Sequence, residues 1–254
     1  MSVVTYERRG HLALITLNRP DRLNALDHDM VAELAVAWRR YACDDDAWIA
    51  ILTGAGRVFC AGRDLRDRQA RGETGYGLPR SPERDPFWHD ELEKPTIAAV
   101  NGHALGGGFF LAARTDLRVA VDIATFEVTE VLRATLAGFQ LELSQNLPAA
   151  IAAELAAGEP LTAARAYDVG FVNRLVPDGQ ALPAAIDLAE SILSRPPQAV
   201  DYNLRLARRL RSRRVPQDVW DQAKAWQAEL LDTEDRAESF RAFLERRRPV
   251  FRRR

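Results

Sequence analysis

The stretch VNGHALGGGFFLAARTDLRVA, residues 100–120, places Gly106, Gly107 and Gly108 between a strand-like apolar segment and a helix-like apolar segment. Glycines permit positive φ angles and close approach of another backbone. They also leave the first amides of the following helix exposed at the positive end of its dipole. Such amides can hold a developing oxyanion, and tight helix packing is the alternative reason for small residues here. The spacing does not match the G-x-G-x-x-G of a dinucleotide-binding turn.

Outward from this stretch, strand-like and helix-like segments alternate along the chain. Residues 3–20 predict a β-hairpin that turns at Arg9–Gly10. The apolar spacing in residues 27–46 predicts a helix that Asp27 or Asp29 caps. Short apolar runs predict further strands at 48–54, 94–102, 117–121 and 171–176. The alternation indicates the α/β class, with a parallel or mixed sheet.

The chain is expected to divide into an α/β core, residues 1–195, and a helical C-terminal region, residues 196–254. Pro196 and Pro197 mark the break between the two, and beyond Leu182 the pattern is helical throughout. Within the core, residues 66–93 are rich in Gly, Pro and charge, which predicts a mobile loop or a loop that contains a little helix.

The composition excludes several classes of function. Of the 254 residues 47% are apolar, which is enough to bury a sizeable core and excludes a wholly disordered chain. A formal net charge of −1 gives no overall attraction to nucleic acid or membranes. No signal peptide or membrane-spanning run is evident, so we expect a cytoplasmic protein. Cys43 and Cys60 are expected to be reduced, and the scarcity of Cys and His argues against a metal site.

Positive charge gathers locally in residues 205–214 and in the tail ERRRPVFRRR, residues 245–254. A solvated helix face and a loose terminus explain such clusters in most proteins. Contact with a phosphorylated ligand is the alternative.

Five motifs follow one another in an order that resembles the enoyl-CoA hydratase/isomerase family, the crotonase superfamily. They are ITLNRPDRLNALD (15–27), VFCAGRDL (58–65), KPTIAAVNGHALGGGFFLA (94–112), ARAYDVGFVNRLVP (164–177) and TEDRAESFRAFLERRRPVF (233–251). The resemblance covers residues 3–251. It implies a crotonase-like spiral of repeated β-β-α units with a C-terminal helical region that serves oligomerisation and coenzyme A contact. It also implies a homotrimer or hexamer, and an acyl-CoA thioester as ligand, with no cofactor besides the coenzyme A of the substrate.

The resemblance assigns roles to particular backbone groups. The amides of Arg63 and Gly107 would form the oxyanion hole for the thioester oxygen. Coenzyme A would contact the adenine loop, the AGRD motif and the tail, at Leu23, Asn24, Ala25, Ala61, Asp64, Arg247, Arg248 and Phe251. Arg63 departs from the small residue that is common at its position.

The resemblance also locates the acid/base residues. Hydratases of this family carry two glutamates, and the matching positions here are Phe110 and Glu130. A phenylalanine cannot transfer a proton, so Glu130 is predicted to be the single acid/base and Phe110 to line an apolar substrate pocket. Glu127 is the rival if the register slips, and His103 either lines the acyl pocket or is packed in the structure.

A single carboxylate above an oxyanion hole favours double-bond isomerisation through an enolate. Hydration with one glutamate is the alternative within the enzyme class. A protein that binds acyl-CoA without turnover is the alternative outside it, because the sequence after Glu130 departs from the family pattern. Hydrolytic variants of the family use other residues, and here His89, Asp85 or Tyr76 of the variable loop would take that part.

Overall fold

The computed structural model describes residues 2–72, 79, 85–88, 91–130 and 147–210, and near the C-terminus residues 225, 233–235, 238, 242, 245 and 247–252. Its main sheet has six strands in the order β1-β2-β3-β4-β6-β9. The expected hairpin is confirmed as β1 (Val4–Arg9) paired antiparallel with β2 (Leu12–Leu17), and Gly10 makes the turn with a φ of 59°.

The other strands of the main sheet run parallel to their neighbours. They are β3 (Ile49–Gly54), β4 (Thr96–Val100), β6 (Leu117–Val121) and β9 (Arg174–Val176). Every residue of β3 and β4 is buried. A parallel strand with no exposed residue is covered on both faces, and the α/β expectation is therefore confirmed.

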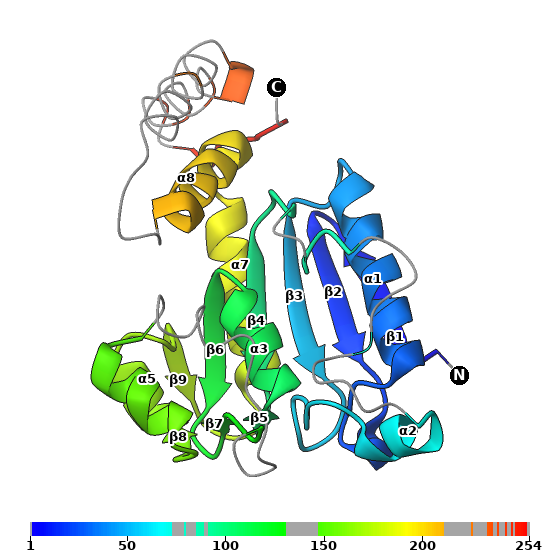
Figure 1. Cartoon of the computed structure of the whole chain (residues 1–254). Coiled ribbons are helices and arrows are strands. Elements are labelled where there is room, and N and C mark those ends of the chain that lie inside the picture. The colour runs from blue at the N-terminus through cyan, green and yellow to red at the C-terminus, as the bar shows by residue number, and fades with distance from the viewer. Residues whose placement is uncertain are drawn as a thin grey trace.

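Helices cover the two faces of this sheet. Figure 1 shows α1 (His28–Cys43) and α3 (Gly107–Arg114) in front of it and α7 (Ala181–Leu193) behind it. Of the two predicted caps for α1, Asp27 is the one used, because its carboxylate accepts the Met30 amide at 2.8 Å. The apolar face of α1 is buried as its spacing predicts, apart from the partly exposed Val31.

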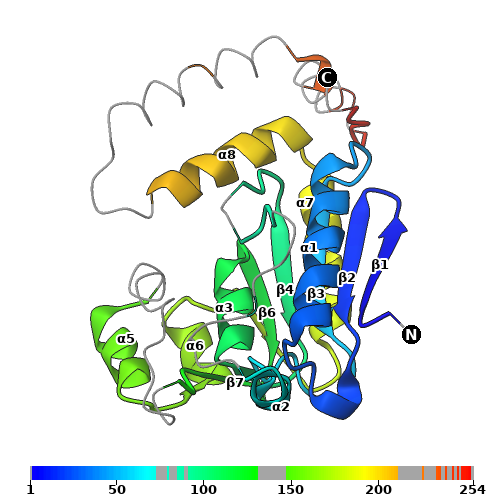
Figure 2. The same cartoon turned by 45° about the vertical axis from the view of Figure 1, so that its right-hand side comes forward.

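A second sheet of three very short strands gathers at one end of the molecule, beside α2 (Leu65–Ala70) and the start of α3 (Figure 2). Its strands are β5 (Ala104–Leu105), β7 (Thr125–Glu127) and β8 (Leu161–Thr162). Strands of two or three residues carry too little alternation to be found from sequence. The sequence from residue 162 predicts a helix that stops at Gly170, and this helix is confirmed as α6 (Ala163–Asp168). Two more helices were not separated in the sequence pattern, η1 (Pro20–Arg22) and α5 (Ala149–Ala156).

The helix α8 (Pro197–Leu210) lies across the end of the core and is held there by two of its arginines. Arg208 pairs with the buried carboxylate of Asp116 at 2.6 Å, and Arg205 pairs with Glu93 at 2.8 Å. Asp116 also accepts the Thr96 amide and hydroxyl, at 2.8 Å each. Arg205 and Arg208 of the basic stretch 205–214 therefore attach α8 to the core, and contact of this stretch with a phosphorylated ligand stays a prediction.

Candidate active site

The segment after β3 brings Arg63 between two neighbouring backbone segments. Cys60 forms a bridge with Ala104, and the Leu105 amide donates to the Cys60 carbonyl at 2.9 Å. On the other side the Gly62 carbonyl accepts the Leu26 amide at 2.7 Å. A trans peptide directs its N–H opposite to its C=O. The Arg63 amide therefore points away from Leu26.

Two glycines, Gly62 and Gly108, let this segment lie against the start of α3. A Cβ at Gly62 would lie 2.6 Å from the Leu105 carbonyl oxygen and 3.1 Å from the Gly107 nitrogen, and its φ is 82°. A Cβ at Gly108 would lie 2.2 Å from the Cys60 carbonyl oxygen. The structure thus brings the backbone next to Arg63 beside the Gly107 amide. Gly107 is the first residue of α3, where an amide has no carbonyl within the helix to bond.

The carboxylate of Glu130 lies against the same glycine turn. A Cβ at Gly106 would be 2.9 Å from Glu130 Oε1 and 2.8 Å from Thr129 Oγ1. The turn is fixed by the Gly106 amide, which donates to the Glu127 carbonyl at 2.8 Å, and Gly106 has a φ of 50°. Glu130 Oε2 is buried. Parallel pairing of β5 with β7 carries the two loops to this common point.

Glu127, the rival carboxylate, belongs to a different set of contacts. Its Oε1 accepts the Thr125 hydroxyl at 2.9 Å, and Thr125 Oγ1 also lies 2.9 Å from His103 Nδ1. The pairing of β5 with β7 sets these side chains on the face opposite the buried Phe126. His103 is exposed and bonded to a side chain. Of the two carboxylates, Glu130 is the one described at the glycine turn.

Phe110 lies one helical turn beyond Gly107 and is only 5% exposed. Its ring packs against Trp88, with the ring centroids 4.6 Å apart at 55°, and the Arg114 guanidinium lies 5.2 Å from its centroid. Sequence reasoning did not single out Trp88. The aromatic doublet Phe87–Trp88 within an otherwise polar loop was the signal that could have found it.

Of the three loop residues considered for a hydrolytic role, the structure describes only Asp85. Asp85 is buried, and its carboxylate accepts the amides of Phe87 at 2.9 Å and Trp88 at 3.2 Å. This is the geometry of a turn cap, not of an exposed nucleophile. His89 and Tyr76 lie outside the described residues.

Asn24 of the predicted adenine loop is fully buried, and its side chain links this loop to the segment after β3. Its Nδ2 donates to the carbonyls of Ala55, Val58 and Phe59, at 2.8–3.2 Å. Its carbonyl accepts the Cys60 thiol, and the Leu23 carbonyl accepts the Ala61 amide at 3.0 Å. Leu23 and Asn24 both have positive φ angles.

The remaining groups of the loop and of the AGRD motif are also bonded within the protein. The Ala25 carbonyl accepts Arg19 Nη1 at 2.8 Å. Asp64 accepts the Arg66 and Asp67 amides as the cap of α2 and pairs with Arg19 at 3.3 Å. Adenine contact at Leu23–Ala25 stays a prediction, and it would use the second lone pair of these carbonyls.

Both predicted contact arginines of the basic tail, Arg247 and Arg248, are exposed, and Arg247 is also paired with carboxylates. Arg247 pairs with Glu238 and Glu245, both at 2.5 Å, and these carboxylates raise the pKa of its guanidinium. Arg248 is exposed, whereas the Phe251 ring is buried. The tail's role in coenzyme A binding stays a prediction, for which Arg248 has the more accessible charge.

Neither thiol nor metal chemistry is suggested by the described residues. Cys60 is buried, and burial raises the pKa of its thiol to about 12, so it stays protonated at neutral pH. In the part of the chain that the structure describes, no three His, Cys, Asp or Glu residues group as metal ligands. The same part contains no helix long and apolar enough to cross a membrane.

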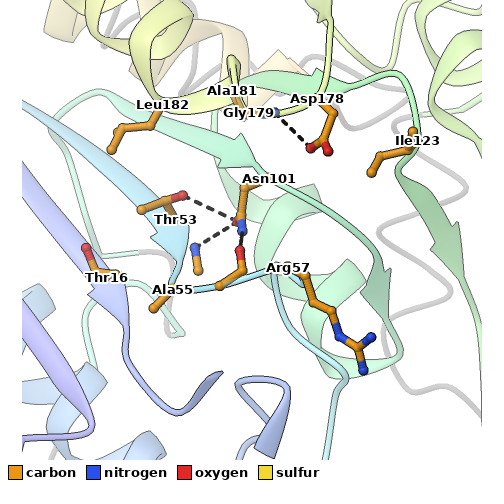
Figure 3. Close-up of a pocket in the computed structure, with 12 residues that line it drawn as sticks. Thr16, Thr53, Ala55, Arg57, Asn101, Ile123, Asp178, Gly179, Ala181 and Leu182 are labelled. Carbon is orange, nitrogen blue, oxygen red and sulfur yellow. Dashed lines mark hydrogen bonds between the residues drawn. The ribbon is translucent and has the colours of Figure 1, made fainter. Parts of the chain in front are cut away.

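A cavity of about 550 Å³ lies at the carboxyl ends of β2, β3 and β4, beside the start of α7 (Figure 3). Its lining includes none of the predicted site residues. Asn101 stands at its centre and is bonded on both sides: Nδ2 donates to the Gly56 carbonyl at 2.8 Å, and Oδ1 accepts the Gly54 amide at 3.0 Å. These contacts fix the loop that leads to Cys60. Asn101 therefore stabilises the segment that carries Arg63 without lying in the candidate site.

Comparisons with known proteins show the family and the fold of the chain. The family model of enoyl-CoA hydratase/isomerase matches residues 7–254. The (E)-benzylidenesuccinyl-CoA hydratase of Thauera aromatica is 37% identical over 98% of both chains. The enoyl-CoA hydratase EchA19 of Mycobacterium tuberculosis is 36% identical over 96% of this chain and 94% of its own. The crystal structure of an enoyl-CoA hydratase from Mycobacterium tuberculosis H37Rv, 38% identical, superposes with a TM-score of 0.90 over the whole of both chains. The expected crotonase-like fold is thereby confirmed, and the chain belongs to the enoyl-CoA hydratase/isomerase family of enzymes.

Proposed function

We propose that this enzyme moves the double bond of a 3-enoyl-CoA thioester from C3–C4 to C2–C3, through an enolate. Glu130 removes a proton from C2 of the 3-enoyl thioester and returns it at C4, so the double bond ends between C2 and C3. The amides of Arg63 and Gly107 hold the thioester oxygen while it carries the negative charge. The observation that carries the proposal is the Glu130 carboxylate beside Gly106, the N-cap residue of the helix α3 that bears Phe110.

Phe110 stands where a hydratase of the family has its first glutamate, and this missing carboxylate favours isomerisation over hydration. Isomerisation needs one group that shuttles a proton between C2 and C4 on one face of the substrate. Hydration must also position and deprotonate a water molecule. Phe110 offers no lone pair for that task, whereas its apolar ring keeps water away from the enolate.

Hydration is the second candidate, and two observations favour it. Relatives named hydratases match nearly the whole chain. In addition, Thr129 Oγ1 lies at the same glycine as Glu130 Oε1, at 2.8 and 2.9 Å from the Cβ position of Gly106. In this candidate the Thr129 hydroxyl and the Glu130 carboxylate together hold the attacking water.

The test incubates the purified enzyme with trans-3-hexenoyl-CoA and with trans-2-hexenoyl-CoA in D₂O and analyses the products by mass spectrometry. Conversion of the 3-enoyl to the 2-enoyl thioester without water addition is the expected result. Glu130→Gln should abolish it, with Glu127→Gln as the matched control, because the Glu127 carboxylate bonds Thr125 and only its backbone carbonyl contacts the glycine turn. An unchanged rate in Glu130→Gln would refute the acid/base assignment.

The same experiment separates the second candidate. Hydroxyacyl-CoA as the product would establish hydration, and Thr129→Val should then slow it about tenfold, as expected for one lost hydrogen bond to the water. Thr129→Ser keeps the hydroxyl and should retain the rate. Tight binding of both thioesters without any product would instead indicate an acyl-CoA-binding protein.

A further inference from the structure

We propose that the Trp88–Phe110 pair selects the acyl group, and that the preferred acyl chains carry a flat aromatic or conjugated group beyond C3. The inference deepens the proposed function and rests on it, since it takes the thioester oxygen to lie at the Gly107 amide. It concerns the part of the substrate that the oxyanion hole does not touch.

Helix geometry places the pair next to the reacting carbons. Phe110 follows Gly106 by four residues and Gly107 by three, and its amide donates to the Gly106 carbonyl at 3.0 Å. Residues three and four apart lie on one helix face, with Cβ atoms about 5–6 Å apart. Glu130 Oε1 lies at Gly106. With the thioester oxygen at Gly107 and C2 at Glu130, the rest of the acyl chain leaves beside Phe110.

Trp88 is the open member of the pair. Phe110 is 5% exposed, whereas Trp88 is 39% exposed, although the two ring centroids are only 4.6 Å apart. An exposed tryptophan next to a buried phenylalanine offers an apolar surface that a ligand can extend. Aromatic rings add to such a surface in tilted or offset arrangements, which gain energy beyond their buried area.

Within the described residues, the segment 85–88 that carries Trp88 is held by contacts of the protein itself. The Asp85 carboxylate accepts the Trp88 amide, and the neighbouring Phe87 ring stacks on Trp38, with centroids 4.4 Å apart at 8°. Arg114 links this segment to α3, because its Nε and Nη2 donate to the Phe87 carbonyl at 3.2 and 3.0 Å.

Such a fixed surface distinguishes flat groups from flexible ones. An aryl group has few rotatable bonds, so it loses little conformational freedom when it packs against the two rings. A straight alkyl chain with as many carbons must order every bond to make the same contact. The geometry therefore favours the aryl thioester at equal carbon number.

The experiment measures equilibrium binding of 3-phenylpropanoyl-CoA and nonanoyl-CoA by isothermal titration calorimetry, with free CoA as the baseline. The two acyl groups have the same number of carbons, and both are saturated, so neither reacts. Wild type should bind the phenyl compound about two- to tenfold more tightly. Trp88→Leu should abolish this preference and Trp88→Phe should keep part of it. Tyr167→Leu, which replaces an exposed aromatic residue on α6, is the matched control and should keep all of it.

Each outcome bears on the proposal. Equal affinity, or tighter binding of nonanoyl-CoA, would overturn it, as would a preference that persists in Trp88→Leu. If neither thioester binds more tightly than CoA, the aryl proposal and the proposed function both fail. If the aryl preference holds but no enoyl-CoA is converted, only the proposed function fails.

Discussion

The two ends of the candidate site use their polar groups in different ways. At the thioester end (Gly62, Arg63, Gly106, Gly107 and Glu130), glycines bring two backbone segments and a carboxylate to one point. At the coenzyme A end (Leu23–Ala25, Asp64 and residues 247–251), most of the predicted contact groups already bond other parts of the protein. The side chain of a motif residue can therefore stabilise the fold, while a backbone atom of the same motif is the group that would contact the ligand.

The largest effect that this comparison predicts lies at the thioester end. Glu130→Gln should lower kcat by roughly a hundredfold to ten-thousandfold, the usual contribution of a general acid or base. Binding of a saturated acyl-CoA should change little, because the side chain keeps its size. Steady-state kinetics and calorimetry check the two statements. A loss of affinity with unchanged kcat would move Glu130 from the chemistry to substrate binding.

The next effect tests whether close packing of the glycines makes the oxyanion hole. A Cβ in Gly108→Ala would lie 2.2 Å from the Cys60 carbonyl oxygen and 2.7 Å from its Cβ, so the start of α3 must move away. We expect kcat to fall by about a hundredfold, the size of losing one oxyanion donor.

Gly72→Ala is the comparison for this variant. Its φ of 63° strains an alanine, but no atom lies within 4 Å of the added Cβ. It should lower stability by about 1 kcal/mol without an effect on kcat. Equal kcat values for the two variants would contradict the packing account of the thioester end.

At the coenzyme A end the scaffold interpretation predicts lost stability without lost affinity. Asn24→Ala leaves the carbonyls of Val58 and Phe59 without their buried donor. Each buried group left unsatisfied costs about 1–3 kcal/mol. Thermal unfolding should show a lower Tm, while the Kd for free CoA stays within about twofold at a temperature where the variant is folded. A large increase in Kd at unchanged Tm would make Asn24 a direct ligand contact.

The elements most reliably predicted from sequence were those with a long run of patterned apolar residues or a clear turn. The hairpin at Gly10, the helix that Asp27 caps and the buried strand 49–54 follow from local pattern alone. The sheet formed by β5, β7 and β8 was missed because its strands hold only two or three residues each. Yet this sheet brings Glu130 to Gly106, so the site depends on pairings that local pattern does not encode.

The same division holds for the site residues. Gly107 and Glu130 were selected by motif position, and the structure brings both to one turn. Coenzyme A contact at Asp64 stays a prediction, and the structure shows that its carboxylate caps α2 and pairs with Arg19. Trp88 was missed because its place in the candidate site depends on its ring contact with Phe110, which lies on a different element, α3. Sequence pattern indicates which residue types are present, whereas side-chain partners depend on tertiary packing.

The smallest expected effect separates the two arginines of the tail. Both arginines are exposed, but the Arg247 charge is already matched by Glu238 and Glu245. An exposed cation near a phosphate contributes little and is screened by salt. Arg248→Ala should therefore weaken CoA binding about two- to fivefold at low ionic strength, with a smaller effect at high ionic strength. Arg247→Ala should weaken it less, and should instead lower the Tm, because the Val250 amide bonds the same Glu238 carboxylate. The reverse order of affinities would mean that the ion pairs of Arg247 open when coenzyme A binds.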